Sequence, residues 1–198
     1  MATGARQQLI TQLVSEVVGL EPEVNKSFAW LLNKHTAPIF KGHFDIVNEL
    51  FITLKGDSFS CQTKQTRFLA CDAYFGGSYH FIFEFDEFQH FSTPRLRSLE
   101  KYPANLPLQF KLEEWKKNCQ THLPSADKYR YNKLTKEFAF AGGRTAQRAY
   151  LDTFKDLLPP LYGLQPTLRI SEFEVSDIIK RDKYGRGKIE ILLKEKMG

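Results

Sequence analysis

The chain has 198 residues and a mass of 23.0 kDa, which suits one domain with a substantial core. Hydrophobic residues make up 42% and charged residues 26%, with 17 Phe and 8 Tyr, so the composition excludes a disordered or low-complexity chain. No stretch reaches the about 20 apolar residues that span a bilayer, and Met1 to Gln8 lack the layout of a secretory signal. We therefore expect a soluble, cytoplasmic protein that folds as a single domain over 1–198.

The three cysteines, Cys61, Cys71 and Cys119, are an odd number and form no CxxC pair. This pattern predicts neither a disulfide framework nor a cysteine zinc site, and it fits a reducing compartment.

Positive charge is concentrated in one region of the chain. The net charge is +5, and 12 basic residues face only 5 acidic ones between Ser92 and Arg148. Such a segment indicates a polyanionic partner, although a solvated surface is the simpler interpretation of a charge run.

The N-terminal segment, 1–57, is predicted to be helical. Apolar residues recur at helical spacing over Arg6–Leu20, Ser27–Asn33 and Phe44–Leu54, and Gly19 is a suitable terminator of the first helix. From Ser58 the pattern changes, and strands are predicted over 58–63, 67–75 and 79–85, with a Gly-Gly turn before the last.

The last of these strands has a period of two. Phe81, Phe83 and Phe85 alternate with residues that include Glu84 and Asp86, so the phenylalanines share one face and the carboxylates the other. This pattern predicts one core face and one charged face.

The second half is predicted as a basic insertion over 92–143, followed by a helix, a strand and a basic tail. Helices are expected near Leu112–Asn118 and over Thr145–Leu158, where Pro159 and Pro160 should end the helix. Thr167–Val175 alternates like a strand, and Lys188–Lys194 fits either an edge strand or a short helix. The expected fold class is α/β, with a central mixed sheet flanked by helices.

Acidic residues on adjacent predicted strands indicate chemistry in the segment 58–91. Asp72 precedes the Gly-Gly turn and Glu84 follows it, so the two carboxylates can converge on one divalent cation, with the Phe85 carbonyl as a further oxygen ligand. Such a site suits Mg²⁺, for which Mn²⁺ can substitute, and the metal would activate a water and neutralise a phosphodiester. A nearby His or carboxylate would assist the water, which is the chemistry of a nuclease.

The order D-x(11)-E-x-D-x(3)-H, with Gln before the His, resembles the restriction-endonuclease-like PD-(D/E)XK superfamily. The similarity is greatest to its very-short-patch-repair-like branch, whose second strand reads approximately E-[IVF]-D-G-x-Q-H. The corresponding stretch here is Glu84-Phe85-Asp86-Glu87-Phe88-Gln89-His90. The resemblance implies that Asp72 and Glu84 are metal ligands and that the remaining active-site residues are Asp86, Gln89, His90 and, from the preceding helix, Glu49.

Two positions depart from the family pattern. Glu87 stands where the branch has Gly, and Asp86 stands where the superfamily commonly has Lys, so the general base stays open between His90 and Asp86. Each residue also has a simpler interpretation: Glu84 and Asp86 as a solvated strand face, Asp72 as a turn residue, His90 as an ordinary polar side chain, and Glu49 as a solvent-facing helix residue.

Aromatic residues are interleaved with the basic segment, a mixture that suits phosphate contact and base stacking. Gly142 and Gly143 precede a predicted helix start at which Arg144 could meet a phosphate, or at which Thr145 could be a plain N-cap. The residues expected to contact nucleic acid are Arg95, Arg97, Lys116, Lys117, Arg130, Lys133, Arg144, Arg148 and Arg169. A basic tail is expected to assist them, through Lys180, Arg181, Lys183, Arg186 and Lys188.

These observations predict a Mg²⁺-dependent endodeoxyribonuclease of the sequence-specific restriction type, acting on double-stranded DNA, with a homodimer as the expected form for cutting both strands. The alternatives are a mismatch-repair nicking endonuclease, an inactive nucleic-acid-binding module of the same fold, and a hydrolase of small phosphoesters with a closed apolar pocket.

Overall fold

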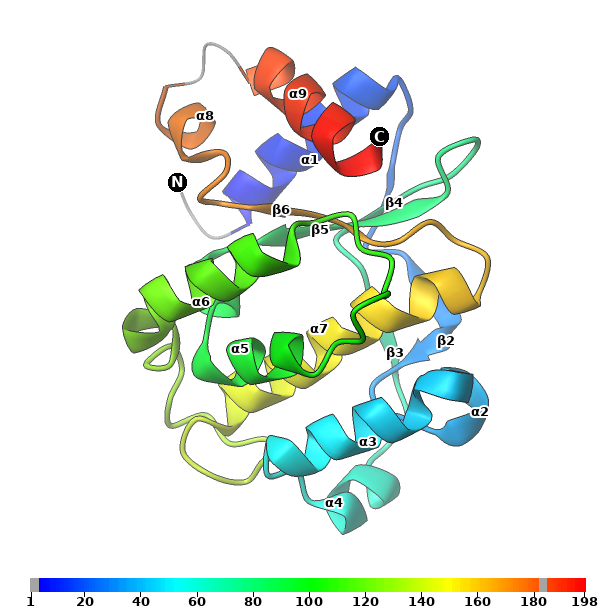
Figure 1. The fold of residues 1–198 in the computed structure, drawn as a ribbon, viewed down its shortest axis with the longest axis vertical. Coiled ribbons are helices and arrows are strands. Elements are labelled where there is room, and N and C mark those ends of the chain that lie inside the picture. The colour runs from blue at the N-terminus through cyan, green and yellow to red at the C-terminus, as the bar shows by residue number, and fades with distance from the viewer. Residues whose placement is uncertain (1–3, 182–184) are drawn as a thin grey trace.

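The computed structural model describes residues 4–181 and 185–198, and its core is a four-stranded mixed sheet (Figure 1). The strands, in the order in which they lie, are β1 (Glu23–Val24), β4 (Ala73–Phe75), β5 (Phe81–Asp86) and β6 (Leu168–Ser171). The pairs β1–β4 and β4–β5 are antiparallel, whereas β5 and β6 are parallel. The predicted α/β class with a mixed sheet is confirmed.

Helices cover both faces of this sheet. In Figure 1, α1 (Ala5–Val18) and α9 (Gly185–Met197) lie on one face and α7 (Gly143–Leu161) lies on the other. Parallel strands need a crossover connection, and the connection from β5 to β6 contains α5 (Thr93–Glu100), α6 (Leu112–Ala126) and α7. No helix in the described ranges is long and apolar enough to cross a membrane.

Strand β5 is buried on both faces. Phe81, Phe83 and Phe85 pack in one core with residues of α1, α9 and β6, as the period of two predicted. The opposite face is covered by α7, and Glu84 and Asp86 are only 2% and 1% exposed. The interpretation of these carboxylates as a solvated strand face is therefore wrong.

The prediction for Ser27–Asn33 is wrong, because this segment is a strand. β2 (Ser27–Leu32) pairs antiparallel with β3 (Phe68–Ala70) in a separate two-stranded sheet, and its side chains alternate in exposure. The N-terminal segment is thus not wholly helical. Its other helical elements are α2 (Ala37–Phe40), a 3₁₀ turn (Lys41–His43) and α3 (Phe44–Thr53), the last of which agrees with the prediction.

The prediction of a strand over 58–63 is also wrong. The segment forms α4 (Ser58–Thr63), because the Asp57 side chain accepts a hydrogen bond from the Ser60 backbone N–H (2.7 Å) and caps the helix.

The basic segment is packed into the domain. After the 3₁₀ turn Phe88–His90, the segment forms α5 (Thr93–Glu100) and α6 (Leu112–Ala126), which runs well beyond the predicted end. The two α-helices pack against each other and share a core that includes Phe91 and Trp115.

Helix α7 continues through Pro159 and Pro160, where the sequence predicted its end. A proline at 159 has no N–H to donate to the Lys155 carbonyl, and the Thr167 hydroxyl donates to that carbonyl instead. The helix begins after Gly142, which has a φ of 86°, so Thr145 is not its N-cap. Strand β6 is shorter than predicted, and the chain after it forms α8 (Ser176–Arg181) and then α9. For Lys188–Lys194 the sequence left an edge strand or a short helix open, and the segment is helical.

Candidate active site

A polar cleft of about 260 Å³ is lined by residues of β3, β5 and α7 and by the segments next to them. Three of the predicted catalytic residues, Asp72, Glu84 and His90, line it. The full lining is formed by Gln7, Leu69, Ala70, Asp72, Glu84, Phe85, Glu87, His90, Arg144, Arg148, Leu151, Asp152 and Lys155.

Asp72 and Glu84 are joined directly, as the sequence predicted for adjacent strands. The Asp72 backbone N–H donates to Glu84 Oε1 (3.1 Å), and Asp72 Oδ2 accepts from the Phe85 backbone N–H (2.8 Å). Both contacts follow from the antiparallel register that places Ala73 opposite Phe83. The two carboxylates therefore lie at the same corner of the cleft.

Lys155, which the sequence did not single out, reaches this corner from α7. Its Nζ lies 2.7 Å from Glu84 Oε2, and both groups are almost fully buried. Burial raises the pKa of Glu84 to about 7, more than the nearby Lys155 ammonium lowers it. Burial alone would lower the pKa of Lys155, but Glu84 and Asp72 outweigh it and raise that pKa above its ordinary value.

His90 is held by a second carboxylate from α7. Its Nδ1 lies 3.0 Å from Asp152 Oδ2, and since a carboxylate only accepts, Nδ1 donates to it, which leaves Nε2 as the acceptor of the neutral ring. The His90 side chain is 19% exposed. Burial raises the pKa of Asp152, but His90 and Arg169 outweigh that effect and hold it well below its ordinary value.

Asp86 does not line the cleft. Its Oδ1 pairs with Arg169 Nη1 (2.7 Å), its Oδ2 accepts from Trp115 Nε1 (2.9 Å), and Arg169 also pairs with Asp156 (2.6 Å). Asp86 thus belongs to a buried charge network that holds β5, β6 and α7 together. The structure leaves its carboxylate no direct access to a substrate.

Arg169 and Arg95 were expected to contact nucleic acid, and for both residues this prediction is wrong. Arg169 is 0% exposed and Arg95 is 1% exposed. Arg95 Nη2 pairs with Asp156 (2.7 Å), and its Nη1 donates to the Tyr102 hydroxyl (2.9 Å). Both guanidiniums balance buried carboxylates and cannot reach a ligand at the surface.

Gln89 acts beside the cleft rather than in it. Its side-chain amide donates to Glu87 Oε2 (2.7 Å), and its backbone carbonyl accepts from Arg148 Nη1 (3.0 Å). These contacts position Glu87 and Arg148, which do line the cleft.

Glu49 lies away from the cleft, on the exposed face of α3. Its side chain is 63% exposed and pairs with Lys101 (2.5 Å). The resemblance placed this residue in the active site, and the structure does not bring it there.

The remaining basic residues differ in where they lie. Arg144 and Arg148 line the cleft. Four others are exposed outside it, namely Arg97, Lys117, Arg130 and Lys133. Lys116 pairs with Glu113 (2.8 Å).

The basic tail is described only partially. Arg186 is exposed and Lys188 pairs with Asp177. Lys183 lies outside the described residues, as do the side chains of Lys180 and Arg181.

A sequence signal for the two residues that were missed, Asp152 and Lys155, does exist. Arg144, Arg148, Asp152 and Lys155 follow each other at intervals of four, four and three, which places them on one face of α7. Charged residues on one face of an otherwise apolar helix indicate a face that meets a polar site.

Within the described ranges, no three side chains of His, Cys, Asp or Glu are grouped closely enough to hold a metal ion by themselves. Cys61, Cys71 and Cys119 are free and buried. Comparison of the chain with protein-family models, with curated proteins and with solved structures finds no match.

Proposed function

We propose that this protein is a metal-dependent endonuclease that hydrolyses phosphodiester bonds in DNA. The observation that supports this most is the cleft in which Asp72 and Glu84 lie beside Lys155, with Arg144 and Arg148 on the same walls. Two carboxylates suit a divalent cation, and clustered cations suit a phosphodiester anion.

The donor set fits Mg²⁺, with Mn²⁺ as a substitute. Asp72 and Glu84 would hold the ion, and Mg²⁺ is usually bound by one or two carboxylates while water and phosphate oxygens complete its shell. When bound, the ion would lower the pKa of a water and neutralise charge on the phosphodiester.

Lys155 would supply a fixed positive charge. Its raised pKa keeps the amine protonated near neutral pH, so it stabilises developing charge on the phosphate rather than accepting a proton. The PD-(D/E)XK pattern has a lysine two residues after the glutamate, where Asp86 stands here, and Lys155 brings an amine to the same glutamate from α7.

His90 would accept the proton. Its ring is oriented by Asp152 and lines the cleft, whereas Asp86 is bound by Arg169 and Trp115. Of the two residues that the sequence left open as general base, the geometry favours His90.

The restriction type would cut both strands of a duplex, and for so small a chain that implies a homodimer with two sites. A mismatch-repair nicking enzyme would leave nicks in one strand only. An inactive binding module would bind without cutting.

The test incubates plasmid DNA with wild type, Glu84→Ala and Glu190→Ala, with Mg²⁺, Mn²⁺ or EDTA, and resolves the products on a gel. Glu190 is a matched control, because it is an exposed acid on α9, across the sheet from α7. We expect metal-dependent fragments or nicks from wild type and Glu190→Ala, and none from Glu84→Ala. Salt-sensitive binding without cleavage by any of the three proteins would support the binding module instead.

A further inference from the structure

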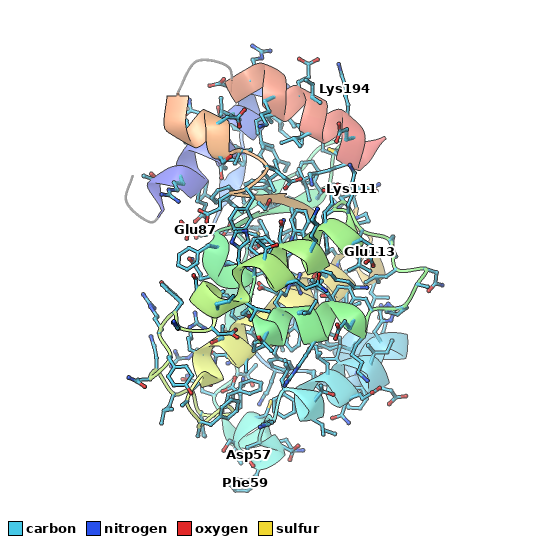
Figure 2. All side chains as sticks on the ribbon, turned by 60° about the vertical axis from the view of Figure 1, so that its left-hand side comes forward. Asp57, Phe59, Glu87, Lys111, Glu113 and Lys194 are labelled. Atoms are coloured by element: carbon cyan, nitrogen blue, oxygen red, sulfur yellow. The ribbon has the colours of Figure 1, made fainter. Side chains whose placement is uncertain are left out.

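We propose that the chain between α6 and α7 is an arm that binds a single nucleic-acid strand and leads it into the cleft, an inference that rests on the proposed function. The basic arm is residues 127–142. In Figure 2 its yellow-green coil lies on the same side of the molecule as Glu87, which lines the cleft.

The basic arm exposes positive charge to solvent. Its four basic residues are all exposed, and they are Lys128, Arg130, Lys133 and Lys136. Both of its acids are engaged elsewhere, since Asp127 accepts from Thr93 (2.8 and 2.6 Å) and Glu137 pairs with Lys64 (2.5 Å) in the interior. The net charge offered to a ligand is therefore that of the four cations.

A stack of side chains connects the arm to the cleft. Two guanidiniums lie over the Tyr129 ring, with Arg130 Cζ 5.3 Å and Arg148 Cζ 5.2 Å from its centroid. Arg148 lines the cleft, so positive charge is continuous from the arm to the carboxylates. A phosphate backbone can follow this path.

Tyr131 is the exposed ring of the arm. It is 51% exposed, and its carbonyl accepts from the Gly142 N–H (2.7 Å), which closes the arm on itself. The Phe138 side chain at the base of the arm is fully buried and fixes it to the core. A held, exposed aromatic ring within a basic surface is what an unpaired base needs for stacking.

A single strand fits this surface better than a duplex. The bases of a duplex already stack on one another and leave no ring face for Tyr131, and a duplex is too stiff to bend locally into a small cleft. An unpaired strand can present a base to Tyr131 while its backbone descends to Glu84, which is only 2% exposed. Cleavage is therefore expected at or beside unpaired segments.

The test measures fluorescence anisotropy in EDTA, so that binding is read without cleavage. The probes are a labelled DNA oligonucleotide about 20 nucleotides long, which exceeds the usual binding-site size, the same sequence as RNA, and a hairpin duplex of the DNA. The proteins are wild type, Tyr131→Ala, Tyr131→Phe, Lys133→Ala and Ile191→Ala. Ile191 is a comparably exposed apolar residue on α9, at 59% against 51% for Tyr131.

We expect at least one of the single strands to bind more tightly than the hairpin, and Tyr131→Ala to weaken that binding by about 5- to 100-fold, the size of one lost base stack. Tyr131→Phe keeps the ring and should recover most of the loss, and Ile191→Ala should bind as wild type does. Lys133→Ala should reduce the slope of log affinity against log salt by about 0.7, the value for one phosphate contact on a single strand.

Hairpin binding as tight as that of both single strands, or equal affinities of Tyr131→Ala and Ile191→Ala, would overturn the proposal. The result is independent of the proposed catalysis. If no plasmid is cut but Tyr131 still controls single-strand binding, the proposal of a binding arm is supported and the proposed nuclease activity is wrong. If Glu84-dependent cutting occurs but the Tyr131 substitutions do not change binding, the nuclease activity is supported and the binding arm is wrong.

Discussion

Replacement of Arg169 by methionine should destabilise the fold strongly, because Arg169 is the central cation of the buried charge network. Its guanidinium pairs with Asp86 (2.7 Å) and Asp156 (2.6 Å) and is 0% exposed. Methionine fills a similar volume but leaves these carboxylates without that cation.

The size of the loss in stability depends on the partners that each carboxylate keeps in Arg169→Met. Asp156 retains Arg95 (2.7 Å) and the Tyr102 hydroxyl (2.6 Å), whereas Asp86 retains the neutral Trp115 N–H (2.9 Å) and a longer contact with His90 Nδ1 (3.6 Å). The loss is thus that of one broken buried pair, about 3–5 kcal/mol of the free energy of unfolding. For a domain of this size that is a fall in Tm of roughly 6–20 °C.

The pKa of Asp156 also determines how the loss of stability in Arg169→Met changes with pH. Burial raises the pKa of Asp156, but Arg169 and Arg95 outweigh it and hold that pKa below its ordinary value. A lowered carboxyl pKa gives stability that is present above the unfolded pKa of about 3.8 and is lost as the pH falls further. The gap between wild type and Arg169→Met should therefore be largest near neutral pH and shrink in acid.

Urea unfolding followed by circular dichroism, near neutral pH and again at about the pKa of a free aspartate, measures both effects. The double variant Asp86→Asn/Arg169→Met removes the charge and its partner together, and it should lose less than the sum of the two single changes. A loss below about 1 kcal/mol in Arg169→Met, together with weakened nucleic-acid binding, would refute the reasoning and restore Arg169 as a surface contact.

Three further results are expected. Asp152→Asn removes the carboxylate that orients His90, so kcat should fall by about 100-fold or more with KM almost unchanged; an equal rise in KM would point to a substrate-binding role. Glu49→Ala should cleave DNA as wild type does and change stability by less than about 0.5 kcal/mol, since its ion pair is exposed; loss of cleavage in a folded variant would return Glu49 to the site. Burial raises the pKa of Cys71 and Cys119 to about 12, so a thiol reagent should label them far more slowly in native protein than in urea; rapid native labelling would contradict their burial.

The strand that carries the site could be predicted because its alternation is strict. Phe81, Phe83 and Phe85 lie together in the core, as their spacing required. The burial of Glu84 and Asp86 could not be predicted, because it depends on α7, a helix about 60 residues further on that covers their face of the sheet.

The two wrong elements have different causes. Ser27–Leu32 is a strand only because Phe68–Ala70 pairs with it, and a pairing partner some 40 residues away leaves no local signal. Helix α4 did leave one, since Asp57 followed by Ser58 is a helix-capping sequence, and the weak alternation of the next residues obscured it.

The sequence could predict the part of the candidate site that is formed by neighbouring strands. It could not predict the residues that tertiary contacts bring there from other elements. Asp72 and Glu84 are brought together by a short hairpin, which sequence spacing can indicate. Lys155 and Asp152 come from a different element, and Glu49 lies on a helix face that turns outward, which the family pattern does not encode.

The parallel pairing of β5 with β6 also governs when the site can form. Phe83 pairs with Leu168 across 85 positions of the chain, so this contact closes late and has a high entropic cost. A nascent chain that has left the ribosome only as far as α7 carries both carboxylates and Lys155 but lacks Arg169, which neutralises Asp86 behind them. The buried network around Asp86 therefore forms only once β6 is in place, and a partly synthesised chain holds Asp72, Glu84 and Lys155 before that network exists.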